Sequence, residues 1–165
     1  MDNKTIRKIV FAGIIAALYA VLTLALAPIS YGAIQFRVSE ILVLLAYFDP
    51  MYIGGLTLGC FIANLLGPNG VWDIIFGTLA TFISVNAIYF TSKINIKEKY
   101  RLFIASIWPT VFNGAIIGVM LAYMLNIPLL VSILEVAVGE FVVVTIVGVP
   151  IIYKLRDKIR KIQIK

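Results

Sequence analysis

The sequence predicts an all-α integral membrane protein, a single domain (residues 1–165) that forms a bundle of six transmembrane helices. Composition is the first reason: 62% of the 165 residues are hydrophobic, 13% are charged, and the mean hydropathy is +1.04, which lies outside the range of soluble domains. Length is the second, because about 20 residues per spanning helix leave room for about six helices and no separate soluble domain. The third is charge placement, since all but one of the 14 Lys and Arg residues lie in three clusters beside apolar runs.

Turn signals divide the apolar sequence into helices. Pro28 and the turns at 49–50, 67–70 and 126–128 separate the apolar runs, because Pro, Gly and Asn favour turns over helix interiors. Asp73 is expected to cap the fourth helix, and Pro109 is expected to bend the fifth. The expected helices are 7–27, a shorter one at 37–48, 51–66, one that begins at 73, 102–125 and 129–153.

The basic clusters predict the orientation of the bundle. Residues 4–8, 93–101 and 154–165 hold every Lys and Arg except Arg37, and with six helices all three clusters fall on one side of the membrane. The positive-inside rule makes that side cytoplasmic, so both termini are expected inside the cell. Arg37 is then the one basic residue on the outer side.

The residue types present argue against an enzyme and against a metal site. The chain has no His and a single cysteine, Cys60, so ordinary metal-ligand sets and internal disulfides are excluded. No serine lies beside a plausible base, and no Gly-Lys-Ser loop is present to cradle a phosphate. The net charge of +6 comes from the membrane-flanking clusters, so nucleic acid is not an expected partner. We therefore expect no cofactor on this chain.

Ionisable residues inside the apolar runs predict a buried polar site. A charge near the bilayer centre costs on the order of 2.5–3.5 kcal/mol on insertion scales, so these side chains should face the interior of the bundle. Arg37 and Glu40 are three residues apart and could simply pair with each other. Glu135 and Glu140 are about 140° apart around a helix, so they should meet different partners. The residues of this set are Arg37, Glu40, Asp73, Glu135 and Glu140.

Carboxylates outnumber basic groups in this set, which favours a ligand that is cationic or rich in N–H donors. Gln35 and Asn113 add amide groups, and aromatic rings could supply a stacking wall for a planar ligand. The alternative for each ring is an ordinary aromatic of the membrane interface. The rings are Tyr31, Phe36, Trp72 and Tyr123.

Small residues form a stripe along the first helix. Ala12, Ala16 and Ala20 lie on one face, where another backbone can approach closely. The stripe can serve packing within the bundle or contact with a partner chain, and the residues alone favour internal packing.

Four segments, in the same order, resemble the QueT family of queuosine-precursor transporters, which are substrate-binding S components of energy-coupling factor (ECF) transporters. The resemblance covers essentially the whole chain and includes Asn113-Gly114 on the fifth helix. The segments are Ile34-Gln35-Phe36-Arg37-Val38-Ser39-Glu40, Gly59-Cys60-Phe61-Ile62-Ala63-Asn64-Leu65, Asp73-Ile74-Ile75-Phe76-Gly77-Thr78-Leu79-Ala80-Thr81 and Gly139-Glu140.

The resemblance implies a multi-pass subunit of the bacterial cell membrane that captures a deazaguanine from outside. It implies a transmembrane coupling subunit and two cytoplasmic ATPase subunits as partners, so that ATP is used by the partners only. It also makes Ala12, Ala16 and Ala20 a docking surface for the coupling subunit. Glu140 or Glu135 is expected to accept from the guanine-like edge. The full set expected to bind substrate is Gln35, Arg37, Glu40, Trp72, Asn113, Glu135 and Glu140.

Other interpretations remain. A facilitator acting alone would need no partner but should show a continuous polar file across the membrane. The inner halves of the helices are almost wholly apolar, with Asn86 the chief exception. An S component for a different small heterocycle and a structural membrane subunit are the remaining alternatives.

Overall fold

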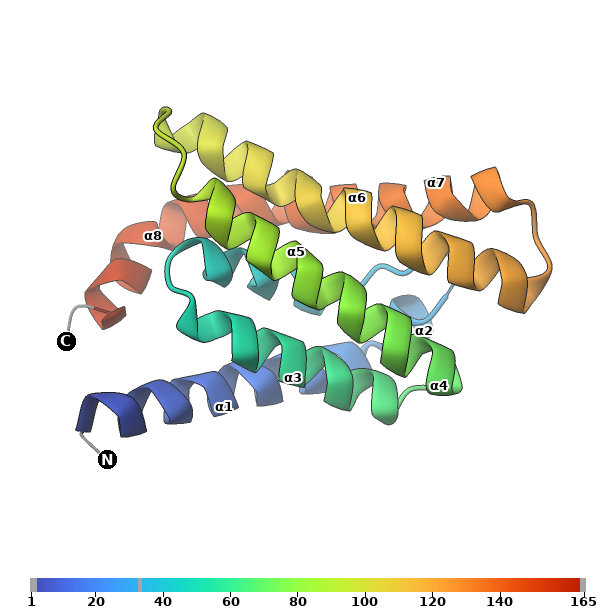
Figure 1. Ribbon diagram of the computed structural model, residues 1–165, viewed down its shortest axis with the longest axis horizontal. Coiled ribbons are helices and arrows are strands. Elements are labelled where there is room, and N and C mark those ends of the chain that lie inside the picture. The colour runs from blue at the N-terminus through green and yellow to red at the C-terminus, as the bar shows by residue number, and fades with distance from the viewer. Residues whose placement is uncertain (1–2, 33, 164–165) are drawn as a thin grey trace.

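Every element in the described part of the chain is helical. The computed structural model describes residues 3–32 and 34–163, and these contain no strand. Figure 1 shows the longer helices running alongside one another, so the prediction of an all-α protein is confirmed. The elements are α1 (Asn3–Ala25), α2 (Ala27–Ser30), the 3-10 helix η1 (Val38–Tyr47), α3 (Met51–Leu65), α4 (Gly70–Trp72), the π-helical η2 (Asp73–Gly77), α5 (Thr78–Thr91), α6 (Glu98–Leu125), α7 (Leu129–Glu140), the π-helical η3 (Phe141–Gly148) and α8 (Val149–Gln163).

Four helical stretches among the described residues are long and apolar enough to cross a membrane. They are Thr5–Ala25, Gly70–Thr91, Glu98–Leu125 and Leu129–Lys161. Two shorter apolar helices, Val38–Tyr47 and Met51–Leu65, lie between the first and second of these stretches. The structure therefore fits a helical membrane protein, and the count of six spanning helices stays a prediction.

The basic clusters gather at one end of the bundle. Figure 1 shows the start of α1, the connection from α5 to α6 and the end of α8 at the same end. The short helices α2 and α4 and the connection from α6 to α7 lie at the opposite end. This arrangement is the one that the charge pattern requires, while the side of the membrane that each end faces stays a prediction.

The fourth helical stretch begins earlier than expected, and Asp73 does not cap it. The stretch runs from Gly70 through η2 to Thr91, so Asp73 lies inside the helix with a fully buried side chain. The N-cap prediction is wrong because the Asp73 carboxylate is held instead by a basic residue from another segment.

Two other helix ends also differ from expectation. The first helix ends at Ala25, and Pro28 lies in the first turn of the short α2, where its missing N–H group is not needed. The last helical stretch continues through α7, η3 and α8 to Gln163, well past the expected end at Tyr153. Helix α6 continues through Pro109.

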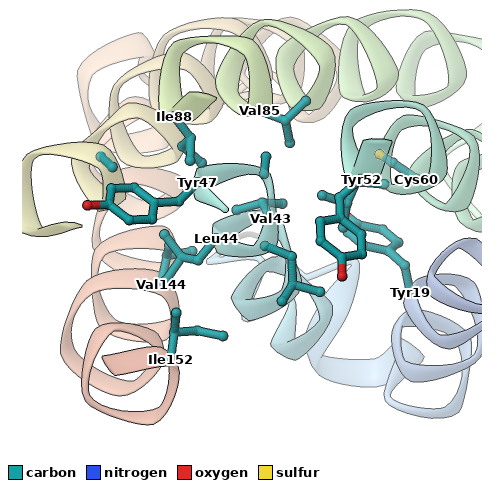
Figure 2. Packing of buried hydrophobic residues seen from close by; sticks show 14 of the residues in the cluster. Tyr19, Val43, Leu44, Tyr47, Tyr52, Cys60, Val85, Ile88, Val144 and Ile152 are labelled. Atoms are coloured by element: carbon teal, nitrogen blue, oxygen red, sulfur yellow. The ribbon is translucent and has the colours of Figure 1, made fainter. Parts of the chain in front are cut away.

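The 3-10 helix η1 is the buried centre of the bundle. Val43, Leu44 and Ala46 are fully buried, and α1, α3, α5 and η3 all pack against η1. Figure 2 shows Val43 and Leu44 surrounded by side chains from these neighbouring elements. Residues 43–47 are all buried, which explains why this part of the helix is hydrophobic. A rise of about 2.0 Å per residue lets the ten residues of this short helix extend about 20 Å.

Helices α1 and α3 pack closely through small residues. A Cβ atom added at Gly55 would lie 2.6 Å from the Ala12 carbonyl oxygen, and one added at Gly59 would lie 2.8 Å from that of Ala16. Both separations are shorter than real Cβ contacts, so the two glycines allow the backbones to touch. The alanine stripe of α1 is therefore occupied by α3 within the chain.

Candidate functional site

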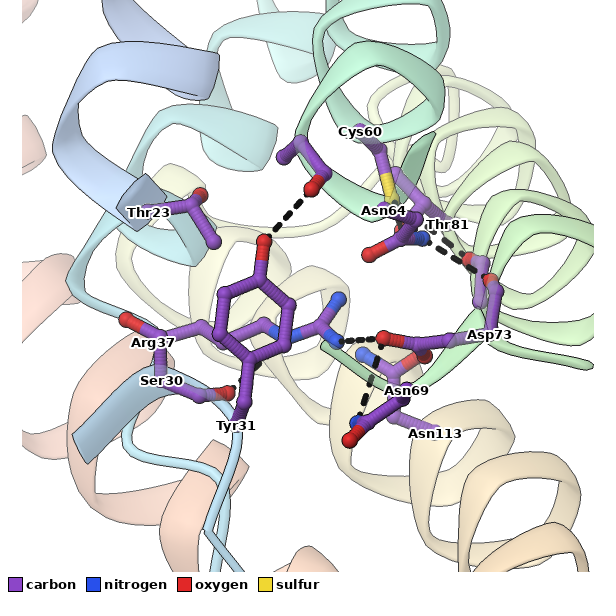
Figure 3. A network of polar contacts seen from close by, with 12 residues as sticks. Thr23, Ser30, Tyr31, Arg37, Cys60, Asn64, Asn69, Asp73, Thr81 and Asn113 are labelled. Atoms are coloured by element: carbon purple, nitrogen blue, oxygen red, sulfur yellow. Dashed lines mark hydrogen bonds and ion pairs between the residues drawn. The ribbon is translucent and has the colours of Figure 1, made fainter. Parts of the chain in front are cut away.

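A buried ion pair joins the segment before η1 to η2. Arg37 Nη2 lies 2.8 Å from Asp73 Oδ2, and the two side chains are 4% and 0% exposed. Arg37 Nε donates to the Ser30 carbonyl oxygen at 3.2 Å, and the guanidinium carbon lies 5.2 Å from the centre of the Tyr31 ring. Figure 3 shows this pair at the middle of a polar network. The alternative in which Arg37 pairs with Glu40 is therefore wrong.

Glu40 lies in the first turn of η1 and meets α1. Its Oε1 atom accepts a hydrogen bond from the Tyr19 hydroxyl, and both side chains are buried. Close by on the same two elements, the hydroxyl groups of Thr23 and Ser39 form a hydrogen bond of 2.6 Å. The second oxygen, Glu40 Oε2, has no partner among the residues that the structure describes.

Glu140 ends α7 inside the bundle. Its Oε1 atom accepts a hydrogen bond of 2.8 Å from Asn113 Nδ2 of α6, and both side chains are buried. Glu140 also interacts electrostatically with Glu40 and Arg37. Like Glu40, it has a buried Oε2 atom without a partner in the described ranges. Carboxylates from η1 and from α7 therefore share one region.

Gln35 is held beside this region in an unusual backbone conformation. Its φ angle is +50°, in the left-handed region that few residues other than glycine adopt, and its side chain is 2% exposed. The neighbouring Ile34 carbonyl oxygen lies where a Cβ atom of residue 139 would be, so only glycine fits there. Because Gly139 precedes Glu140, this contact fixes the segment before η1 against the end of α7.

The cluster has more unpaired acceptors than unpaired donors. Buried polar atoms normally have partners, and leaving one unpaired costs about 1–3 kcal/mol. Within 3–32 and 34–163, the unpaired buried atoms near these residues include four acceptor oxygens, and Gln35 Nε2 is an unpaired donor. The acceptors are Glu40 Oε2, Asp73 Oδ1, Glu140 Oε2 and Asn64 Oδ1. A ligand with N–H donors or a positive charge would satisfy them.

Helix α3 supports the cluster through Asn64 and Cys60. Asn64 Nδ2 donates to the Asp73 carbonyl oxygen at 3.0 Å and to Cys60 Sγ at 3.3 Å, and the Thr81 hydroxyl donates to the same sulfur at 3.2 Å. A Cβ atom at Gly77 would lie 2.5 Å from Asn64 Nδ2, so Gly77 makes room for this amide. These bonds hold η2, and with it Asp73, against α3.

An apolar groove of about 510 Å³ lies next to the cluster along two elements. Trp72, the residue before Asp73, stacks on Phe76 with a centroid distance of 5.9 Å and an interplanar angle of 13°. Ile116, one turn beyond Asn113, lines the groove from α6. The volume is in the range of small-molecule sites. The lining residues are Trp72, Phe76, Ile116, Val119, Met120, Tyr123 and Met124.

The remaining candidate residues lie apart from the cluster. Glu135 is half-buried on α7 and makes no hydrogen bond or ion pair with any described residue. Ala16 and Ala20 are buried, and Ala12 is half-buried, because α3 covers this face of α1. Of the seven residues expected to bind substrate, the structure gathers Gln35, Arg37, Glu40, Asn113 and Glu140 and places Trp72 in the adjoining groove.

Residues 9–157 match the family model described as QueT transporter. The chain belongs to the QueT transporter family. A curated relative in this family, named queuosine precursor transporter QueT, from Lactococcus lactis subsp. cremoris (strain MG1363), is 43% identical to the chain over 104 residues. That alignment covers 61% of this chain and 59% of the relative, so it spans less than two thirds of the relative's length. No solved structure matches the chain.

Membership of the QueT transporter family confirms the resemblance that the sequence motifs predicted. Sequence reasoning missed Tyr19 as the partner of Glu40 and Asn64 as the support of Asp73. A polar ring on the inward face of an apolar helix was the available signal for Tyr19. The buried amide in the Gly59–Leu65 motif was the signal for Asn64.

Proposed function

We propose that this chain is the substrate-binding membrane subunit of an ECF importer and that it captures a queuosine precursor, a 7-deazaguanine, in the buried polar cluster. The observation that carries this proposal is the set of unpaired acceptors from Glu40, Asp73 and Glu140 in one buried region of a transporter-family chain. A guanine-like edge presents a ring N–H and an amino group side by side, which a carboxylate accepts as a pair.

Each side chain of the cluster has a distinct role in this proposal. Glu140, oriented by Asn113 at 2.8 Å, accepts from the guanine-like edge. Gln35 Nε2, a buried donor without a partner among the described residues, donates to the ring carbonyl group. Arg37 is a positioning residue, because its guanidinium is already engaged by Asp73 and by the Ser30 carbonyl oxygen.

The adjoining groove completes the proposed site. Its stacked rings, Trp72 and Phe76, present a flat aromatic surface of the kind on which a planar heterocycle stacks. Trp72 is 56% exposed, so its ring is accessible without any rearrangement of the bundle. In this proposal, the ligand first stacks in the groove, and the polar cluster then forms hydrogen bonds with the polar edge of the ligand.

The apolar core beyond the cluster supports a role for partner subunits. Val43, Leu44, Val85, Ile88 and Val144 are fully buried and form a continuous apolar layer around η1. A polar heterocycle cannot cross this layer unless the bundle moves. We propose that a coupling subunit and two cytoplasmic ATPase subunits supply that movement, with the basic end of the bundle facing the cytoplasm.

Uptake in cells tests this function. Cells unable to make queuosine precursors would express the chain with the coupling and ATPase subunits, with ATPase subunits that cannot hydrolyse ATP, or alone, and uptake of labelled precursor would be measured. We expect uptake only with the complete, active set. Equal uptake by the chain alone would contradict the S-component function and favour a facilitator.

A further inference from the structure

We propose that η1 is a stretched 3-10 helix, held at both ends by polar contacts, and that release of the end near α6 and α8 shortens it toward an α-helix and displaces its start. The inference concerns how the bundle changes shape. It goes beyond the proposed function and does not depend on which ligand the buried cluster takes.

The 3-10 conformation of η1 extends over an unusually long run. The helix has ten residues, Val38–Tyr47, whereas runs longer than three or four residues are uncommon because 3-10 hydrogen bonds have poorer geometry. Bonds between residues three apart are present at both ends. Glu40 N donates to the Arg37 carbonyl oxygen at 2.9 Å, and Phe48 N donates to that of Leu45 at 3.0 Å.

The local sequence does not account for this conformation. Residues 38–47 contain neither glycine nor proline, and the leucines and the alanine among them are good α-helix formers. A local preference that the fold overrides indicates strain or function. The 3-10 form of η1 is therefore imposed by contacts with other elements.

The first anchor holds the start of η1. The N-cap residue Arg37 lies 2.8 Å from Asp73 of η2, and the hydroxyl groups of Ser39 and Thr23 form a hydrogen bond of 2.6 Å. Glu40 also accepts a hydrogen bond from α1. All five side chains are buried, so the start of η1 is tied to α1 and η2 away from water.

The second anchor, which we call the arginine latch, holds the end of η1. Arg101 Nε of α6 donates to the Tyr47 hydroxyl at 2.6 Å, and the guanidinium carbon of Arg160 on α8 lies 5.8 Å from the centre of the Phe48 ring. Arg160 also pairs with Glu98 at the start of α6. Figure 1 shows the start of α6 and the end of α8 at the same end of the bundle. The latch therefore joins both helices to the end of η1.

Between the two anchors, η1 can change its length without breaking a side-chain hydrogen bond. Residues 41–46 are all apolar, and each backbone bond between residues three apart can be exchanged for one between residues four apart. An α-helix rises about 1.5 Å per residue and a 3-10 helix about 2.0 Å, so ten residues would shorten by about 5 Å. Because Arg37 and Glu40 lie at the start of η1, this shortening changes their place relative to the basic end of the bundle.

A distance between two spin labels that flank η1 tests the inference. The labels would be placed by Ile34→Cys and Pro50→Cys, at two exposed positions, in a chain whose buried Cys60 is replaced by alanine. Pulsed electron paramagnetic resonance would measure the distance in nanodiscs without ligand. We expect a single distance when the latch is intact.

Variants of the latch provide the comparison. Tyr47→Phe removes the hydroxyl contact and keeps the ring, and the double variant Arg101→Gln, Arg160→Gln removes both arginines. Each should add a population about 5 Å shorter. Arg156→Gln is the matched control, because Arg156 also belongs to α8 but donates within it, to the Tyr153 carbonyl oxygen at 2.8 Å. This control should keep the single distance.

The outcomes are read on folded chains, as shown by helical circular dichroism. An unchanged distance in Tyr47→Phe and in the double variant overturns the inference, and so does an equal short population in Arg156→Gln. If the double variant does not fold, the result for Tyr47→Phe stands alone, since that change removes a single hydroxyl group. Hydrogen exchange at residues 37–40 should be faster in the latch variants than in the control, and equal exchange would contradict displacement of the start of η1.

Discussion

Replacing Arg37 by methionine is expected to destabilise the protein by about 3–5 kcal/mol, the usual cost of removing one member of a buried ion pair. Methionine keeps much of the length of the side chain but removes the 2.8 Å contact with Asp73 and the 3.2 Å hydrogen bond to Ser30. Asp73 Oδ1 has no partner among the described residues, and Oδ2 would keep only Asn69 at 3.4 Å. The cost therefore comes mainly from an isolated carboxylate in a fully buried position.

The double variant distinguishes this mechanism from loss of packing. Asp73→Asn alone should also destabilise, because it leaves the guanidinium of Arg37 without its carboxylate. Combining it with Arg37→Met removes both charges, so the double variant should lose less stability than the two single variants lose in sum. A coupling of about 1–3 kcal/mol is expected for such a pair.

Unfolding in mixed micelles, followed by loss of helical circular dichroism, measures these differences. The surface pair of Arg156 and Asp157, 3.7 Å apart, is the matched control, since surface pairs contribute about 0–1 kcal/mol. Additive effects of Arg37→Met and Asp73→Asn, or a loss no larger than that of Asp157→Asn, would refute the argument that this ion pair organises the cluster.

Three further variants test the contacts around the site. Gly139→Ala should lower stability by about 1–3 kcal/mol and weaken precursor binding, because its Cβ would displace the Ile34 carbonyl oxygen. Gly54→Ala, with open space around it, should do neither. Thermal unfolding measures the stability, and calorimetry measures the binding. Ala16→Leu should destabilise the chain, because Ala16 packs against α3, and unchanged stability of this variant would argue against the α1–α3 contact. Ala17→Leu lies on the exposed face and should leave the chain folded. Co-purification of the coupling subunit with Ala17→Leu therefore reports on docking. Trp72→Ala should weaken precursor binding with a small effect on unfolding because the side chain is 56% exposed, and full affinity in this variant would remove the groove from the site.

Local patterns predicted the helical class and the charged residues that are buried in the described part of the chain. Composition and charge clustering are properties of the whole chain, so predictions from them do not depend on where each helix begins and ends. The rule that charges inside apolar runs face the interior was sufficient to select Arg37, Glu40, Asp73 and Glu140, all of which are buried. Glu135 satisfied the same rule but is half-buried and outside the cluster, because it lies on a different side of α7 from Glu140.

The partners of those residues could not be read from the sequence. Arg37 and Asp73 are 36 positions apart, and nothing local indicates that the guanidinium prefers η2 to the nearer Glu40. The cap expected at Asp73 was wrong for the same reason, since a long-range ion pair outweighed a local hydrogen bond. The alanine stripe of α1 was ambiguous because small residues permit close approach of any backbone. In this structure α3 packs against the alanine stripe of α1, and docking of a coupling subunit at Ala12, Ala16 and Ala20 stays a prediction.

Hydrogen exchange with and without ligand tests most directly whether the buried cluster is the substrate site. The chain in nanodiscs would be labelled with and without saturating 7-aminomethyl-7-deazaguanine, and protection would be read by mass spectrometry of its peptides. We predict slower exchange in peptides that cover 34–40 and 136–142, which carry Gln35, Glu40 and Glu140. Ligand-dependent protection confined to the helix ends that line the groove, 70–77 and 116–124, with no change around Glu40 and Glu140, would contradict the account.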